Sequence, residues 1–201
     1  MNTMRRIDYD NTSEKTLQRL AADSSLTLFD SYAMGRALRL AARGSGQVSP
    51  NSPLVGCLIV CENGNIVGEG FYGGDDLKHA EAIALEMAGE RARNSTVYVT
   101  LEPHAHFSRT KPCTEALIKA GVRRVVAAMI DPNPLVEGKG IEILRINGIL
   151  AEVGLLEQSA RALNRSYVEQ FTARAEQSEG VTSPTSRRAV ESFVLSEIIG
   201  V

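Results

Sequence analysis

The sequence has few cysteines, little net charge and no long apolar run, and each absence excludes a class of protein. Three cysteines in 201 residues, with no secretory signal ahead of them, do not make the disulfide framework of a small secreted domain, and they favour free thiols in the cytoplasm. No apolar run reaches the roughly 20 residues of a membrane-spanning helix, so no membrane partner is expected. With 22 Lys and Arg against 24 Asp and Glu, the chain lacks the basic surplus of a dedicated nucleic-acid-binding protein.

What the sequence does contain is enough apolar material for one globular domain. Hydrophobic residues make up 43% of the chain, which excludes global disorder, and its length suits one domain with additional tails. We expect a polar N-terminal tail over residues 1–27 and a single domain over residues 28–173. Residues 174–201 are expected to form a polar linker and a short amphipathic end.

Helical and strand-like segments alternate through the expected domain. Asn63-Gly64 is typical of a hairpin turn between two apolar strands. The predicted strands are residues 54–61, 66–71, 96–101, 124–130 and 149–153, and the last of several predicted helices is a long one over residues 156–171. Strands that alternate with helices indicate an α/β domain. We expect helices on both faces of a mixed sheet of about five strands that is mostly parallel, with only the opening hairpin antiparallel.

All three histidines lie in or next to two predicted loops, and one cysteine lies close by. His79 opens a helix as His-Ala-Glu, His104 follows the third strand and Cys113 begins the next helix. Zinc takes imidazole and thiolate ligands and leaves one position for water in catalytic sites, so these three residues could hold it. A helix N-terminus lowers the pKa of a thiol, which would favour the Cys113 thiolate. Glu81 could then move protons without binding the metal. The alternative is that all four are ordinary structural or surface residues.

The pattern His-x-Glu, followed by a strand and a loop that carries Pro, one ligand and a distant Cys, resembles the zinc nucleoside deaminase signature with a longer loop. More closely, residues 30–172 resemble the deaminase domain of the bifunctional deaminase–reductase of riboflavin biosynthesis. The matching stretches are AMGRALRLAARG, SPNSPLVGCLIV, GNIVGEGF, HAEAIALEMAGE, VYVTLEP, RTKPC, IDPNPLVEGKGIEIL and ALNRSY.

This resemblance implies a three-layer α/β/α cytidine-deaminase-like fold and hydrolytic removal of an amino group from a phosphoribosylated diaminopyrimidine. It implies Zn2+ as cofactor, with His79 and Cys113 as ligands, His104 at the remaining ligand position and Glu81 as the catalytic acid and base. Because the family tends to oligomerise, a homodimer or larger homo-oligomer is expected. The residues at substrate-binding positions of the family are Asn51, His106, Arg109, Thr110, Asp131 and Asn133.

Several positions around the expected pocket depart from the family pattern. His104 stands where the family has a cysteine, Tyr72 stands where a histidine is usual, and Ser52 is an extra residue that would displace Asn51. Three hypotheses follow. The first is an active deaminase of the riboflavin pathway, or of a specialised pathway that diverts the same intermediate, such as azapteridine toxin synthesis. The second is an inactive relative that binds a pyrimidine nucleotide or a protein partner. The third, a nucleic-acid base deaminase, is disfavoured by the acidic net charge.

The last residues of the chain, 182–201, resemble an early segment of the family's reductase domain. About 20 residues cannot form a nucleotide-binding core. We therefore expect a truncated remnant and no NADPH chemistry.

Overall fold

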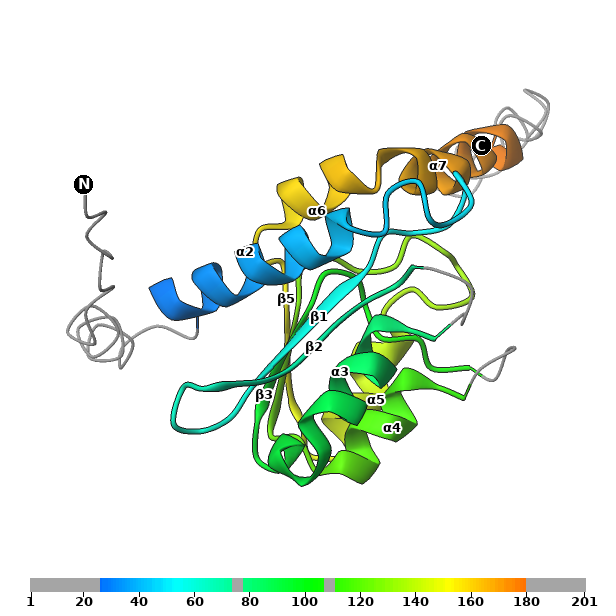
Figure 1. The fold of residues 1–201 in the computed structure, drawn as a ribbon. Coiled ribbons are helices and arrows are strands. Elements are labelled where there is room, and N and C mark those ends of the chain that lie inside the picture. Colours follow the sequence, from blue (N-terminus) through cyan, green and yellow to red (C-terminus); the bar gives the residue numbers. More distant parts are fainter. Residues whose placement is uncertain (1–25, 74–77, 107–110, 180–201) are drawn as a thin grey trace, which may run out of the picture.

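The computed structural model describes residues 26–73, 78–106 and 111–179. A five-stranded sheet lies between two layers of helices (Figure 1), so the expected three-layer α/β/α architecture is confirmed. The strands are β1 (Gly56–Val60), β2 (Ile66–Phe71), β3 (Thr96–Val99), β4 (Arg124–Ala127) and β5 (Leu150–Val153). One face carries helices α2 (Leu28–Ala42), α6 (Glu157–Leu163) and α7 (Arg165–Glu179). The other carries α3 (Ala80–Ala88), α4 (Cys113–Ala120) and α5 (Lys139–Ile146), with a short 3-10 helix, η2 (Gly89–Ala92), after α3.

The sheet has as many antiparallel as parallel pairs. Its order is β2-β1-β3-β4-β5; β1 is antiparallel to both β2 and β3, whereas β4 is parallel to β3 and β5. The prediction of a mostly parallel sheet with one antiparallel pair is therefore wrong in this detail. The crossover from β2 through α3 to β3 does join two parallel strands, but it passes over β1, which lies between them and runs the opposite way.

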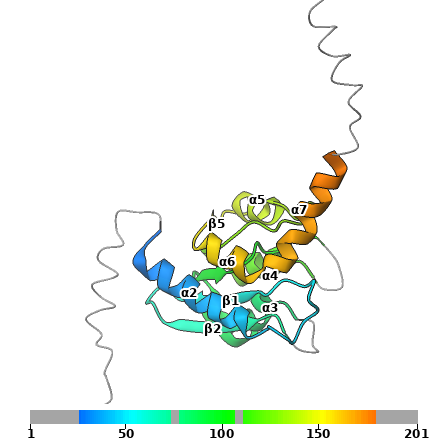
Figure 2. The ribbon, with the colours of Figure 1, turned by 90° about the horizontal axis from the view of Figure 1, so that it is seen from above.

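The long helix predicted over residues 156–171 is two helices, which meet at the buried Asn164. The Oδ1 atom of Asn164 accepts a hydrogen bond from the backbone N–H of Leu54 (2.7 Å), and its Nδ2 donates to the Leu54 carbonyl (3.1 Å). Asparagine side chains that bond to backbone groups compete with helix continuation. This pairing ties the segment before β1 to the start of α7. Figure 2 shows α2, α6 and α7 lying across the same face of the sheet. Within the described residues, no helix has the length and apolar character needed to cross a bilayer.

Two apolar clusters form the core, one on each face of the sheet. Alternate residues of a strand point to opposite faces. Ile59 and Val97 accordingly belong to the cluster beneath α3, and Leu58 and Tyr98 to the cluster beneath α2. Every residue of β1 is buried, because this strand lies between β2 and β3 and helices cover it on both faces.

The open edge of the sheet at β5 is covered by an arginine. Because the backbone N–H of Leu150 bonds to the β4 side, the carbonyl of the next residue, Ala151, faces away from β4. This carbonyl accepts two hydrogen bonds from the Arg145 side chain of α5, from Nε (3.0 Å) and Nη2 (2.8 Å). An edge acceptor that would otherwise be free for another strand is thus occupied.

A partly buried ion cluster joins α2 to the sheet. The Oδ1 atom of Asp30 lies 2.6 Å from Arg124 Nη1 and accepts a hydrogen bond of 2.6 Å from the Tyr98 hydroxyl, and Arg124 Nε lies 2.5 Å from Glu152 Oε2. Asp30 also forms a capping box with Thr27 at the start of α2. Burial favours a higher pKa for Asp30, but the hydrogen bonds from Arg124, Tyr98 and Thr27 together hold the pKa below its ordinary value.

Replacing Asp30 with alanine is expected to lower the free energy of unfolding by about 3 kcal/mol at neutral pH. This is the low end of the cost of breaking a buried ion pair, because Arg124 keeps Glu152 as a partner. Since the folded-state pKa of Asp30 lies below its unfolded value of about 4, its contribution is present above that value and is lost as the pH falls through the folded pKa.

Denaturant titration of wild type and Asp30→Ala at about pH 7 and about pH 3 measures both effects. The difference in free energy of unfolding between the two proteins should be smaller at the acidic pH. A difference at neutral pH that is no larger than that of an ordinary surface substitution would contradict the assigned role.

Candidate active site

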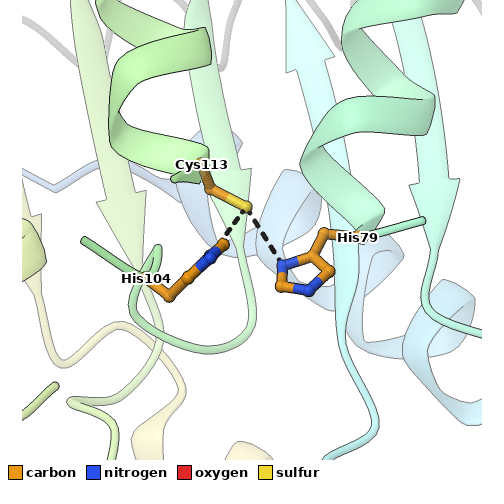
Figure 3. A group of neighbouring side chains, drawn as sticks. All are labelled: His79, His104 and Cys113. Atoms are coloured by element: carbon orange, nitrogen blue, oxygen red, sulfur yellow. Dashed lines mark hydrogen bonds between the residues drawn. The ribbon is translucent and has the colours of Figure 1, made fainter. Parts of the chain in front are cut away.

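Three side chains from separate segments meet at one end of the sheet (Figure 3). His79 is the N-cap of α3, Cys113 is the first residue of α4, and His104 lies in the loop after β3. The Sγ atom of Cys113 is 3.2 Å from Nδ1 of His79 and 3.2 Å from Nδ1 of His104. The potential ligand atoms of the three residues all lie within 4.8 Å of one another, so the convergence predicted from the sequence is confirmed.

This donor set suits zinc. Nitrogen and sulfur ligands of a tetrahedral zinc ion stand roughly 3.5 Å apart, close to the separations found here. Burial, followed by repulsion from His79 and His106, lowers the pKa of His104 to about 4, so its ring is neutral near pH 7 and offers a lone pair. Nε2 of His104 is buried and has no hydrogen-bond partner in the described part of the chain, so no competing contact holds that edge of the ring.

The predicted lowering of the Cys113 pKa by its helix is wrong. Burial raises the pKa of the thiol, and the nearby Glu81, which shares a hydrogen bond with it, raises the pKa further. Helix α4 has only eight residues, and the effect of a helix terminus is typically smaller than that of burying a charge. The thiol therefore holds its proton until a cation displaces it.

Glu81 is the carboxyl group beside this cluster. It lies in the first turn of α3, where it is buried. Burial raises its pKa, and attraction to His79 together with the hydrogen bond to Cys113 opposes that rise. A buried carboxyl group with a raised pKa can take up and return a proton near neutral pH.

A cavity of about 220 Å³ adjoins the cluster. Its walls include His79, Glu81 and His104, together with two tyrosine side chains. Tyr72 lies edge-on to His79, with 5.9 Å between ring centroids, and Tyr167 enters from α7. The cavity thus gives a small molecule access to the potential metal ligands.

The residues expected to bind substrate divide into three groups. His106, Asp131 and Asn133 line the cavity, in agreement with their predicted location. Asn51 is exposed and is not among the lining residues. Arg109 and Thr110 lie outside the described residues.

Glu102 lines the same cavity and was missed by the sequence analysis. This buried carboxylate accepts hydrogen bonds from the backbone N–H groups of Gly138 (2.8 Å), Gly140 (2.8 Å) and Asp131 (3.2 Å). A Cβ atom at Gly140 would lie 2.0 Å from the carbonyl oxygen of Pro103, so the close approach requires glycine. Glu102 thereby fixes the loop that carries Asp131. The available signal was a Glu-Pro pair directly after a strand, together with the distant Glu-Gly-Lys-Gly segment.

The three-layer fold and the His/His/Cys cluster with its adjacent carboxyl group are the features of a zinc-binding deaminase domain. Residues 28–129 match the family described as the cytidine and deoxycytidylate deaminase zinc-binding region. The chain belongs to this family.

Two named relatives and one solved structure show in more detail what this chain resembles. The chain is 45% identical over 181 residues to riboflavin biosynthesis protein RibD of Escherichia coli, with 81% of this chain and 49% of that protein covered. It is 44% identical over 142 residues to the diaminohydroxyphosphoribosylamino-pyrimidine deaminase of Buchnera aphidicola subsp. Schizaphis graminum, with 71% of this chain and 95% of that protein covered. The structure of Acinetobacter baumannii RibD is 48% identical, with a TM-score of 0.68 over 71% of this chain and 40% of that one. The chain thus spans about half or less of the RibD proteins that it resembles.

Proposed function

We propose that this chain is a hydrolytic deaminase of a phosphoribosylated diaminopyrimidine, the type of intermediate used in riboflavin biosynthesis. The proposal depends on one observation: His79, His104 and Cys113 converge at a cavity that also contains the buried Glu81. The substrate class is supported by the name of the Buchnera relative, which this chain covers almost completely.

In the proposed reaction, water replaces the amino group on a ring carbon, ammonia leaves and no electrons are transferred. Zinc, held by the three ligands, would supply a water molecule of lowered pKa. Beside these ligands, Glu81 would take a proton from the attacking water and pass it to the departing amino nitrogen. His104 stays neutral near pH 7 because its pKa is low, so it acts as a ligand and not as a proton donor.

The remaining predicted residues would hold the substrate. His106, Asp131 and Asn133 line the cavity and offer hydrogen-bonding groups to the base and sugar. We assign the phosphate to Arg109 and Thr110, because a guanidinium fork beside a hydroxyl suits a phosphate group. The homo-oligomer and the cytoplasmic location stay predictions, as does the absence of NADPH chemistry.

The direct test is incubation of the zinc-loaded chain with the diaminopyrimidinone nucleotide, following ammonia release and the mass of the product. We expect ammonia in equal amount to a product in which oxygen has replaced one amino group. Binding of the nucleotide without ammonia release would instead favour an inactive relative. In that case His104→Cys distinguishes a lost activity, which it would restore, from a scaffold without chemistry.

A further inference from the structure

A tyrosine hydroxyl group on helix α7 bonds to an aspartate in the wall of the cavity. The side chain of Tyr167 donates a hydrogen bond of 2.9 Å to Oδ1 of Asp131, and both residues line the cavity. The Tyr167 ring packs edge-on against Phe171, with 5.3 Å between ring centroids. The aromatic ring is therefore held in place separately from the hydrogen bond.

The two oxygens of Asp131 have different surroundings. Oδ1 accepts hydrogen bonds from the Asn133 backbone N–H (2.9 Å) and from Tyr167. Across residues 26–73, 78–106 and 111–172, no side chain or backbone group donates to Oδ2. Asp131 lines the cavity, and Oδ2 is not one of the buried polar atoms that lack a partner, so this oxygen is accessible from the cavity and is the atom available to a ligand.

The support for this carboxylate extends back to the sheet. Asn164, just before α7, is bonded to both backbone groups of Leu54, and Tyr167 lies within the first turn of that helix. The backbone N–H of Asp131 is in turn bonded to the buried Glu102. The carboxylate is thus fixed from two sides before any ligand arrives, which lowers the entropy cost of binding.

We propose that Tyr167 is a positioning residue, which holds the Asp131 carboxylate so that its second oxygen accepts a hydrogen bond from a neutral donor on the substrate, a sugar hydroxyl. A carboxylate repels an anion, so the phosphate of the substrate lies away from this wall. The identity of the ligand rests on the proposed function, whereas the role of Tyr167 rests on its contact with Asp131.

The test compares Tyr167→Phe with Tyr98→Phe. Both changes remove a tyrosine hydroxyl that donates to an aspartate, but Tyr98 bonds to Asp30 in the ion cluster beneath α2. For Tyr167→Phe we expect KM for the diaminopyrimidinone nucleotide to rise roughly tenfold, the low end of what a hydrogen bond to a charged group contributes, with kcat within about twofold of wild type. For Tyr98→Phe we expect a lower melting temperature with KM unchanged.

A double-mutant cycle with Asp131→Asn tests whether Tyr167 acts through Asp131. Adding Tyr167→Phe to Asp131→Asn should raise KM much less than it does in wild type. Additive effects would overturn the proposal, as would a Tyr167→Phe protein that loses only thermal stability, like the Tyr98 control.

The proposal can also be tested without turnover. If the wild-type chain releases no ammonia, the proposed function fails, and calorimetric titration with the same nucleotide then decides the role of Tyr167. Binding that is roughly tenfold weaker in Tyr167→Phe supports it. Equal affinity in the two proteins, or no binding to either, overturns it.

Discussion

Glu81→Gln should release ammonia about 1,000-fold more slowly than wild type while keeping its fold and its zinc, because an amide cannot accept the proton that the reaction must move. The amide has nearly the same size as the carboxyl group, so the buried site should stay packed. The measurement is the rate of ammonia release at saturating nucleotide, with zinc content and melting temperature determined on the same preparations.

The matched control is Glu86→Gln on the same helix. Glu86 is exposed and bonded to Lys78, so its replacement should leave the rate unchanged. A Glu81→Gln protein with the wild-type rate would remove this residue from the proton transfer and would leave the reaction without an identified acid and base.

Zinc should bind at one ion per chain, and Cys113→Ser should weaken that binding by at least about 100-fold, since loss of a ligand costs more than loss of a residue that supports one. Metal analysis of protein purified without added zinc, and again after reconstitution, measures this directly. Cys61→Ser is the control, because Cys61 is not part of the ligand cluster. A wild-type chain that stays free of zinc after reconstitution would contradict the metal site.

Zinc binding should also release a proton. Because burial and Glu81 raise the pKa of Cys113, the thiol is protonated near neutral pH and must lose that proton when it becomes a ligand. Zinc affinity is therefore expected to increase as the pH rises, and calorimetry in buffers of different ionisation enthalpy should count about one more released proton for wild type than for Cys113→Ser. Equal proton release by the two proteins would show that zinc binding does not remove the proton of the Cys113 thiol.

The parts of the site that the sequence predicted are those with local signals. His79 and Cys113 lie at the starts of helices with clear apolar periodicity, and His104 follows an obvious strand, so their approximate positions follow from the order of elements along the chain. Loops at the same end of an α/β sheet meet in space. These three candidate ligands, and Glu81 two residues after His79, could therefore be chosen without coordinates.

The parts that were missed depend on contacts between distant segments. Asn164 and Leu54 are 110 residues apart, and Tyr167 and Asp131 are 36 residues apart, so no periodic pattern reports either pairing. Asn164 fits a helical pattern by its spacing, and the bonds of its side chain to Leu54 and to the Ala160 carbonyl lie where α6 ends and α7 begins. The antiparallel pairing of β1 with β3 was missed for the same reason, because an alternation of strands and helices does not specify which strand inserts between two others.

The arginine at the β5 edge has a consequence for how copies of this chain can associate. A sixth strand added beside β5 would have to displace the Arg145 guanidinium from the Ala151 carbonyl and break two hydrogen bonds before gaining its own. Growth of the sheet from one molecule into the next is disfavoured at that edge, which protects a concentrated solution of the protein against fibrous aggregation from this side.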